Sequence, residues 1–352
     1  MKISHNTELG PLTTFGVGGR THVLIECNTI ADIREAIIYA RNNELPITII
    51  GGGSNTLVSD KGFDGVVLLI RTMGVIFSET SPLAGLQQRS DENDIYVKAE
   101  AGEDWDNLVR ITVEKGLWGF ENLSAIPGLV GASAIQNIGA YGVEVQSTIV
   151  AVECIDTTQA DLPTVVLTNK DCNFDYRHSI FKEKPNTYIV TSVIYKLSKQ
   201  AVPNISYPDV KNFFGQSVPQ HSQEVRKAIC EIRSKKLPSL IHYGTAGSFF
   251  KNPIISNEHV KELQEKYPGL PAYPTKNGQY KISLAWLLDK VLHLNGYSIG
   301  SAQVYKNQPL VLAVERGIST SSADVCSLAQ EIEEKCRKEF NLTLEREVCC
   351  IE

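Results

Sequence analysis

The amino-acid sequence predicts an α+β protein with several domains. The chain has 352 residues, of which 42% are hydrophobic and 21% are charged, so it is long enough for two or three ordinary globular cores. Stretches with the two-residue period of strands alternate with stretches of helical period as far as residue 197. From residue 222 onward helical periodicity dominates, which indicates a further region of different composition.

The first predicted unit spans residues 22–50 and has the pattern strand, helix, strand. Thr29 is a suitable N-cap, because a threonine hydroxyl accepts a hydrogen bond from a backbone N–H of the first helical turn. Apolar side chains then recur at i, i+3, i+4 and i+7, namely Ile33, Ala36, Ile37 and Ala40. This spacing predicts one apolar helix face against a sheet.

A polar stretch over residues 78–94 precedes a second unit at residues 95–119. Ile95, Val97 and Ala99 alternate as in a strand, and Asp104 is placed to cap a helix that Gly116 ends. The predicted apolar face of this helix consists of Trp105, Leu108, Val109 and Thr112. Two further runs, residues 149–155 and 187–197, also predict strands.

The third region follows a segment, residues 198–223, whose composition is typical of a loop. A helix is predicted from residue 222 to Pro238, with one face formed by Val225, Ala228, Ile229 and Ile232. Further helices are predicted over residues 258–267, 283–292 and 322–340, and a strand over residues 309–314.

Composition and residue spacing exclude several classes of function. A net charge of −6 argues against a general nucleic-acid or membrane-surface binder, although a local basic pocket for an acidic ligand remains compatible with it. No apolar run approaches the roughly 20 residues of a membrane span and the N-terminus lacks a signal core, so a cytoplasmic protein is expected. The eight cysteines and seven histidines show no metal-ligand spacing, which predicts reduced thiols and no metal site. Adjacent Cys349 and Cys350 are interpreted as strand residues, with a redox role as the less favoured alternative.

Three glycines, Gly51 to Gly53, follow the apolar run of residues 47–50. Their bare backbone N–H groups are suited to an anion, which predicts a phosphate-binding loop that includes Ser54 and Asn55. A dinucleotide fingerprint is absent, because Thr56 stands where its third glycine belongs. From the residues alone, a plain tight turn and a phosphate cradle remain equally open.

A second backbone-rich stretch lies within residues 119–145. Between Gly128 and Gly142, four glycines, three alanines and a serine account for eight of fifteen residues. Close packing of neighbouring elements is one interpretation. The other is a shelf for a large flat cofactor, with backbone and amide groups facing its polar edge.

Six motifs together resemble the UDP-N-acetylenolpyruvoylglucosamine reductase (MurB) family of bacterial peptidoglycan synthesis, in the right order over nearly the whole chain. They are TTFGVGG, IIGGGSN, residues 119–145, DYRHSIFK, GTAGSFFKNP and LEREV. The loop with Tyr207 resembles the type I branch. The resemblance implies an FAD-binding domain of the vanillyl-alcohol-oxidase type in two α+β subdomains, residues 1–72 with the tail 346–352 and residues 73–221. A third α+β domain, residues 222–345, is expected to bind substrate.

The resemblance also implies the reaction and its ligands. Non-covalent FAD and NADPH are expected to reduce the enolpyruvyl ether of UDP-N-acetylglucosamine to UDP-N-acetylmuramate, with NADPH and substrate using one site in turn. The implied cofactor contacts are Gly51, Gly52, Gly53, Ser54, Asn55, Asn122, Ser124, Ile126, Pro127, Gly128, Gly131, Ala134, Gln136, Asn137, Gly139 and Ala140. The implied substrate contacts are Tyr141, Arg177, Tyr207, Arg233, Lys236 and Asn252.

Three residues are expected to perform the chemistry. Hydride addition to an enolpyruvate leaves negative charge that spreads into the carboxylate, and the planar guanidinium of Arg177 suits that carboxylate, unless it forms an ordinary ion pair. Ser248 alone would be taken as a turn residue, but the resemblance assigns it as the proton donor. Glu347 matches the family's C-terminal glutamate, which assists protonation. Here Arg346 stands in place of the usual proline before it and Cys349 in place of the usual arginine, and Glu345 is a competing candidate.

Two alternatives remain open from the sequence. One is a different flavoenzyme on the same scaffold, such as an oxidase, and the other is a nucleotide-sugar or flavin binder without catalysis. All three expected chemical residues, Arg177, Ser248 and Glu347, are present, which favours the reductase. A monomer without nucleic-acid or membrane partners is expected.

Overall fold

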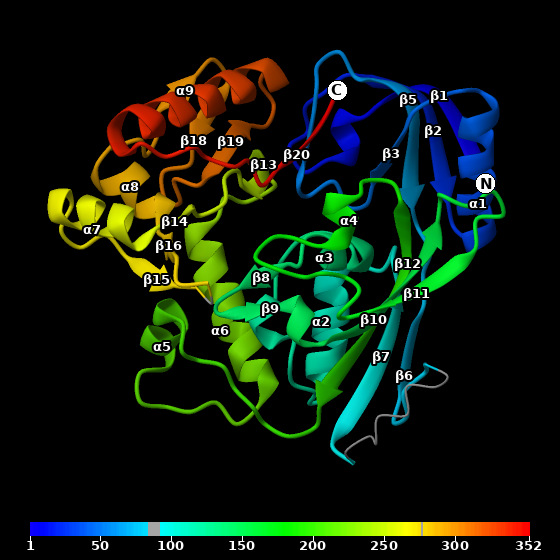
Figure 1. Ribbon diagram of the computed structural model, residues 1–352, viewed down its shortest axis with the longest axis horizontal. Coiled ribbons are helices and arrows are strands. Elements are labelled where there is room, and N and C mark those ends of the chain that lie inside the picture. The colour runs from blue at the N-terminus through cyan, green and yellow to red at the C-terminus, as the bar shows by residue number, and fades with distance from the viewer. Residues whose placement is uncertain (84–91, 276) are drawn as a thin grey trace. The chain divides into compact units, whose positions relative to one another are not determined.

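The computed structural model describes residues 1–83, 92–275 and 277–352, and in it the chain forms two compact units (Figure 1). Unit 1 consists of Met1–Thr7, Thr21–Gly52 and Asp64–Ser234, and unit 2 of Glu8–Arg20, Gly53–Phe63 and Lys235–Glu352. Part of the polar stretch 78–94, residues 84–91, lies outside the described residues. The predicted division into 1–72, 73–221 and 222–345 stays a prediction.

The first sheet of unit 1 confirms the predicted strand–helix–strand pattern of residues 22–50. Its strand order is β1-β2-β5-β3, with β3 and β5 parallel. The strands are β1 (Lys2–Glu8), β2 (Arg20–Cys27), β3 (Ile47–Ile50) and β5 (Phe63–Ile70). Helix α1 (Ile30–Asn42) starts at the capping box of Thr29 and Asp32, and its predicted apolar face is fully buried. Residues 51–62, which include the first glycine stretch, connect the two parallel strands.

The second sheet of unit 1 has five antiparallel strands in the order β11-β10-β12-β7-β6. They are β6 (Val75–Ser78), β7 (Asp94–Glu100), β10 (Ile149–Asp156), β11 (Thr164–Thr168) and β12 (Tyr188–Ser198). Helix α3 (Val130–Ile135) packs on β12 and β7, as Figure 1 shows. The predicted strands at 95–99, 149–155 and 187–197 are therefore confirmed.

Helix α2 (Trp105–Glu114) begins at the Asp104 cap, where the carboxylate accepts the N–H of Asn107 at 2.8 Å. Its predicted face is buried, and the Trp105 ring lies 5.0 Å from the ring of Phe120 and 6.1 Å from that of Tyr195. Lys115 is the C-cap and Gly116 follows with φ +73°, as predicted for the helix end. The short helix α4 (Ile180–Glu183) and the hairpin β8 (Gly139–Ala140) and β9 (Val143–Glu144) complete this part.

The loop expected over residues 198–223 contains a helix, so that expectation is wrong for α5 (Pro208–Phe214). Pro208 occupies the first turn, where its fixed φ favours a helix start. Val210 is buried beside Val225 and Ile229 of α6 (Ser222–Lys236). This packing partner lies outside the local sequence and stabilises a helix too short to form by propensity alone.

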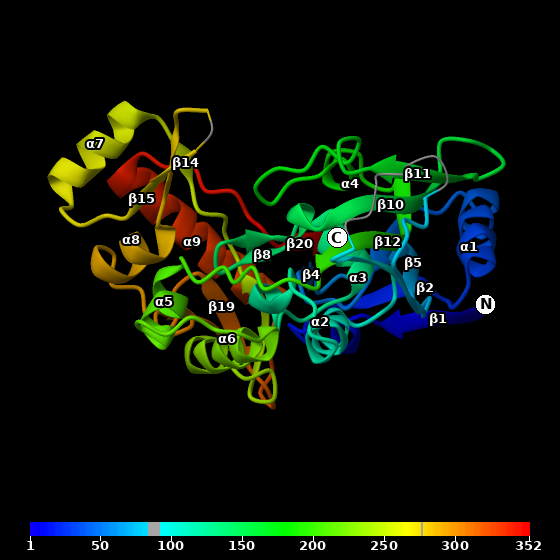
Figure 2. The same ribbon diagram turned by 90° about the horizontal axis from the view of Figure 1, so that it is seen from below.

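Unit 2 contains a four-stranded sheet in the order β13-β19-β18-β17 and a three-stranded sheet in the order β14-β16-β15. Helix α9 packs on β17, β18 and β19, and Figures 1 and 2 both show it beside β19. The strands are β13 (Tyr243–Ser248), β14 (Ile254–Ile255), β15 (Ala272–Pro274), β16 (Tyr280–Ile282), β17 (Ser298–Ile299), β18 (Ala302–Val304) and β19 (Val311–Glu315). The helices are α7 (Asn257–Lys266), α8 (Leu284–Lys290) and α9 (Ser322–Phe340), as predicted.

The last strand of unit 2, β20 (Cys349–Ile351), pairs in parallel with β4 (Thr56–Val58). Cys349 and Cys350 are thus strand residues, as interpreted from the sequence. The core of this unit includes Phe15, Leu57 and Phe340 from three distant segments. The described residues contain no helix long and apolar enough to span a membrane. The α+β class is confirmed.

Candidate active site

The two glycine-rich stretches meet inside unit 1. A Cβ atom added to Gly52 would stand 2.9 Å from the Cα of Gly128, which is tighter than side chains tolerate. Gly128 has φ +129°, a conformation that favours glycine. Gly51, in contrast, has room for a Cβ, since its nearest neighbours would be 3.7 Å away at Leu129 and 3.9 Å away at Ala132. The first glycine stretch thus lies against the second, as a two-walled cradle requires.

A loop of residues 121–128, which begins with the 3₁₀ turn Glu121–Leu123, lies between α2 and α3, and Asn122 is fully buried in it. The Asn122 amide N–H groups donate to the carbonyls of Tyr141 at 3.0 Å and Asn204 at 2.8 Å. Its Oδ1 atom is buried and accepts no hydrogen bond from any described residue. An unsatisfied buried acceptor costs about 1–3 kcal/mol, so this oxygen is suited to a ligand or water that carries a donor.

Thr72 is a second buried polar group that the sequence reasoning missed. Its hydroxyl has no partner among the described residues. Thr72 follows Arg71, whose guanidinium donates to the carbonyl of Gly51 at 3.1 Å, so it lies close along the chain to a contact with the first glycine stretch. No motif surrounds Thr72, and only this neighbourhood identifies it as a candidate ligand contact.

Several other residues between Gly128 and Gly142 are closely packed or buried. A Cβ at Gly131 would lie 2.9 Å from the Cβ of Ala101, and Ala134 is fully buried. Asn137 is also buried, with its amide donating to the Asp175 carbonyl at 2.8 Å. Close packing, the first interpretation of this stretch, therefore describes these three positions.

Three expected cofactor contacts lie in the loop of residues 121–128. Ser124 is buried and donates to the Glu121 carbonyl, while Ile126 is half-buried and Pro127 exposed.

Arg177 lies against the same segment. Its guanidinium donates to the carbonyl of Gly139 at 2.6 Å and to that of Asn137 at 3.3 Å, so it is held by neutral groups in these two contacts. The backbone at Arg177 has φ +51°, which is unfavourable for an arginine. Lys182 donates to the Arg177 carbonyl at 3.3 Å and to the side chain of Gln136 at 3.4 Å. These contacts orient a cation beside the hairpin of Gly139 and Ala140.

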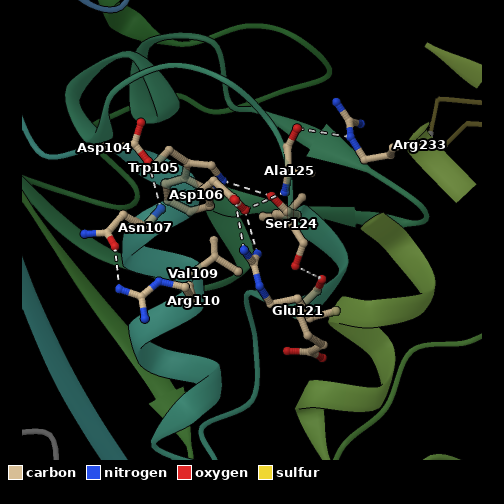
Figure 3. A network of polar contacts seen from close by, with 12 residues as sticks. Asp104, Trp105, Asp106, Asn107, Val109, Arg110, Glu121, Ser124, Ala125 and Arg233 are labelled. Atoms are coloured by element: carbon tan, nitrogen blue, oxygen red, sulfur yellow. Dashed lines mark hydrogen bonds and ion pairs between the residues drawn. The ribbon is translucent and has the colours of Figure 1, made fainter. Parts of the chain in front are cut away.

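A second cation, Arg233 of α6, donates from Nε to the carbonyl of Ala125 at 3.2 Å (Figure 3). Burial lowers the pKa of this guanidinium, while the Tyr141 hydroxyl, to which it is hydrogen-bonded, raises it. The Tyr141 ring lies 5.3 Å from the ring of half-exposed Tyr207 in an edge-on arrangement. Three of the expected substrate contacts are thus together in unit 1.

Unit 2 holds Ser248, the expected proton donor, and Glu347, which is expected to assist protonation. Ser248 ends β13 after an irregularity in the pairing of β13 with β19, between Thr245 and Ser248. Gly247 before it has φ +75°, and Phe249 and Phe250 after it are buried. Irregular pairing of this kind often re-aims a side chain next to an active site. The serine is partly exposed, between exposed Gly247 and buried Phe249.

Glu347 lies beside this strand end. Its backbone N–H donates to the carbonyl of Phe249 at 2.8 Å, and Phe250 forms an isolated bridge with Arg346. Glu345, the competing candidate, is mostly exposed and forms an ion pair with Lys251. Glu347 is half-buried, and its carbonyl accepts the side-chain N–H of Asn55 at 3.0 Å. Both glutamates thus lie on the segment beside Ser248, and the assignment of Glu347 to the chemistry stays a prediction.

The third residue of the glycine loop, Gly53, has a conformational reason to be glycine. Its φ is +62°, and an added Cβ would lie 2.2 Å from the Leu12 carbonyl oxygen. The tight-turn interpretation therefore describes Gly53. Ser54 and Asn55 follow it half-buried in unit 2. Two further expected substrate contacts are also in unit 2, namely half-buried Lys236 in the last turn of α6 and Asn252, whose Oδ1 accepts the N–H of Leu284 at 3.0 Å.

Two family models match the chain. Residues 21–159 match an FAD binding domain, and residues 239–351 match the C-terminal domain of UDP-N-acetylenolpyruvoylglucosamine reductase. The sequence is 36% identical over 341 residues to the UDP-N-acetylenolpyruvoylglucosamine reductase of Pasteurella multocida, covering 97% of this chain and 94% of that protein. It is 38% identical over 352 residues to the reductase of Aliivibrio fischeri, covering 99% and 94%.

A solved structure agrees with the fold. The crystal structure of UDP-N-acetylenolpyruvylglucosamine reductase from Thermus caldophilus superposes with a TM-score of 0.64 at 24% identity. The match covers 100% of this chain and 98% of that one. At this level of identity the likeness concerns the fold.

Proposed function

The chain belongs to the UDP-N-acetylenolpyruvoylglucosamine reductase family, and on this premise we propose how its residues divide the work of the reaction. It is an FAD-dependent oxidoreductase of peptidoglycan precursor synthesis. The reduction converts the enolpyruvyl ether of UDP-N-acetylglucosamine to UDP-N-acetylmuramate. NADPH is proposed as the co-substrate, taking the same site in turn with the sugar nucleotide.

FAD supplies reversible hydride chemistry that no amino-acid side chain provides. The backbone of Gly51, Gly52 and Gly128 is proposed to approach its pyrophosphate, because bare N–H groups favour anions. The unsatisfied oxygens of Asn122 and Thr72 fit a ligand with N–H or O–H donors. The remaining proposed contacts are Gly53, Ser54, Asn55, Ser124, Ile126, Pro127, Gly131, Ala134, Gln136, Asn137, Gly139 and Ala140. Most of these contribute backbone rather than side chain.

Arg177 is proposed to hold the enolpyruvyl carboxylate. Its guanidinium is oriented by neutral carbonyls at 2.6 and 3.3 Å, and a carboxylate would add charge-assisted hydrogen bonds to it. Arg233 and Lys236 are proposed at the diphosphate. The lowered pKa of Arg233 reflects lost hydration, and a bound anion restores stabilisation to such a cation. Tyr141, Tyr207 and Asn252 complete the proposed substrate contacts.

Ser248 is proposed to deliver the proton to the substrate carbon that carries the developing negative charge. An alcohol is a weak acid, but a carbanion or enol is a strong enough base to take its proton when the two are well positioned. Glu347 is proposed to assist protonation. The observation that supports this pairing is the hydrogen bond from the Glu347 N–H to the carbonyl of Phe249, the residue after Ser248.

The test is the visible spectrum of the purified protein. The proposed function expects a yellow protein that bleaches with anaerobic NADPH and regains its colour on addition of the UDP-enolpyruvyl sugar. Rapid recovery of colour with oxygen alone, and none with the sugar, would indicate an oxidase instead. Binding of the sugar without any spectral recovery would indicate a non-catalytic binder.

A further inference from the structure

Asp106 joins the loop of residues 121–128 to helix α6, and nothing in the sequence identified it. The residue lies in the first turn of α2, where the helix dipole stabilises a negative charge. Its Oδ1 accepts the backbone N–H of Ala125 at 2.5 Å, as Figure 3 shows. Arg226 of α6 donates to Oδ1 at 2.6 Å and to Oδ2 at 2.8 Å. One carboxylate therefore binds both the loop and the helix.

Ala125 is held on both sides of its Cα atom. Asp106 accepts its N–H, and the Nε of Arg233 donates to its carbonyl at 3.2 Å (Figure 3). Ala125 has φ +58°, a left-handed conformation that an alanine adopts only when its surroundings impose it. The two hydrogen bonds are part of those surroundings. The orientation of Arg233 is thus coupled to the conformation that Asp106 maintains.

The charges in this group depend on one another. Burial alone would raise the pKa of the Asp106 carboxyl, but the hydrogen bonds and charge of Arg226 and the hydrogen bond from Ala125 outweigh it, so the pKa is lowered. The Asp106 hydrogen bond in turn raises the pKa of Arg226. Arg233 lies in the field of the same carboxylate. Asp106 thus compensates one buried cation directly and a second at longer range.

An ion pair between α2 and α6 is not needed merely to dock α6. The helix already buries Val225 and Ile229 against Trp118. The loop of residues 121–128 is also held by a second contact, because the Trp105 indole donates a hydrogen bond to the Leu123 carbonyl at 3.0 Å. What the Asp106 carboxylate adds is a hydrogen bond to the backbone N–H of Ala125.

We propose that Asp106 is a positioning residue that holds Ala125 in its left-handed conformation and thereby aims Arg233 at a phosphate of the bound nucleotide. The proposal rests on the proposed role of Arg233 in the function above. Both proposed ligands, the sugar substrate and NADPH, carry a diphosphate that Arg233 would contact. Loss of Asp106 should therefore weaken both ligands while it leaves the proton-transfer residues of unit 2 unchanged.

Three variants test the proposal in the full-length protein. Asp106→Ala removes the carboxylate, and Asp106→Leu combined with Arg226→Leu replaces the whole pair by apolar side chains, which often restores stability. Glu114→Gln is the matched control, because it breaks the exposed Arg110–Glu114 ion pair of the same helix. Thermal unfolding, KM and kcat are measured for each variant with FAD bound. Hydrogen exchange of the peptide containing residues 121–128 is measured in the apoprotein.

The expected result for Asp106→Ala is an increase of about tenfold in KM for the UDP-enolpyruvyl sugar and NADPH, the factor that corresponds to one charge-assisted hydrogen bond. The value of kcat should change much less, and the 121–128 peptide should exchange faster. The double variant should keep the raised KM and fast exchange even where its Tm recovers, because the Ala125 N–H still lacks its acceptor. Glu114→Gln should match the wild type.

Wild-type KM and exchange in the double variant would overturn the proposal and leave the pair as a link between two helices. If Asp106→Ala does not fold, the double variant gives the same readouts. A wild-type protein that binds FAD without reducing the sugar would contradict the proposed function instead. The exchange measurement would then still decide whether Asp106 holds Ala125.

Discussion

The backbone N–H of Glu347 donates to the carbonyl of Phe249 at 2.8 Å. Because Phe249 directly follows Ser248, this bond places the segment that contains Glu347 beside the end of β13, where Ser248 lies. The Phe250–Arg346 bridge and the hydrogen bond from the Lys251 N–H to the Glu345 carbonyl at 2.9 Å extend the same pairing. The relative position of Ser248 and Glu347 is therefore fixed by backbone rather than by flexible side chains.

Ser248→Ala should separate the two half-reactions. General-acid catalysis contributes typically about 10²–10⁴-fold, so the reaction with the enolpyruvyl sugar should slow by a factor in this range. The reaction with NADPH needs no proton from this residue and should stay near the wild-type rate. Stopped-flow absorbance measures each separately. Equal slowing of both would mean that Ser248 supports the fold or the cofactor, and no slowing would leave Glu347 or water as the donor.

Arg346→Ala should lower kcat through the position of Glu347. The Arg346 guanidinium donates to both carboxylate oxygens of Glu333 in α9, at 2.7 and 3.2 Å, and lies 5.9 Å from the Phe249 ring centre. A partly exposed ion pair of this kind is worth about 1 kcal/mol, so the fall in Tm should be small. The FAD content should not change. Lys335→Ala is the control, because it breaks an exposed ion pair of the same helix with Glu331; an equal loss of kcat there would contradict the prediction.

Gly51→Ala should weaken FAD binding without destabilising the apoprotein. The nearest atoms to the added methyl group are 3.7 Å away, which is ordinary contact. A ligand that approaches the bare backbone, however, would meet the methyl group. Titration of the apoprotein with FAD, together with its Tm, measures both effects. Gly52→Ala is the comparison, since its Cβ would lie 2.9 Å from Gly128 and should lower both properties. An unchanged FAD affinity in Gly51→Ala would remove Gly51 from the site.

The flavin should leave the protein on denaturation. The motifs that form the proposed cofactor walls, IIGGGSN and residues 119–142, contain neither a cysteine nor a histidine that would tether it covalently. Precipitation with acid followed by absorbance of the supernatant measures the release. Yellow colour retained by the washed precipitate would show a covalent bond instead.

Asp106→Asn should make the Tm of the protein depend less on pH in the acid range. The folded-state pKa of Asp106 lies below its ordinary value of 3.8, so ionised Asp106 contributes stability above that value. This contribution is lost as the pH falls through the lower folded pKa. The Tm difference between wild type and Asp106→Asn should therefore be greatest near neutral pH and shrink below about pH 4. A difference that stays constant from pH 7 to pH 3 would argue against an ionised Asp106 in the folded protein.

Local signals in the sequence predicted much of the secondary structure. The Thr29 and Asp104 caps and the apolar faces of α1, α2 and α6 are all present, because each depends on neighbours within a few residues. The family resemblance, its FAD-binding domain and the reductase function are confirmed by the family models and relatives. The individual site residues stay predictions.

Features that depend on distant partners could not be predicted from the sequence. Helix α5 is stabilised by Val210 against α6, and its proline and polar residues resemble a loop when considered alone. Thr72 and Asp106 lie in no motif. Thr72 is identified only by its neighbour Arg71, which donates to the Gly51 carbonyl, and Asp106 only by its hydrogen bond with Ala125. Asn137 and Gly53, in contrast, lie in recognisable motifs, but the structure also gives them other roles. Asn137 is buried and hydrogen-bonded to Asp175, and Gly53 forms a tight turn.

The discontinuity of unit 2 has a consequence for folding. Its segments Glu8–Arg20 and Gly53–Phe63 are synthesised long before Lys235–Glu352, to which both are hydrogen-bonded, for example through Thr14 and Ser59. Strand β4 pairs with β20, so its edge stays unpaired until nearly the whole chain has left the ribosome. Closing such long loops is entropically costly and slow. Assembly of unit 2 is therefore expected to be the late, rate-limiting stage of folding, during which the exposed edge of β4 invites pairing with other chains.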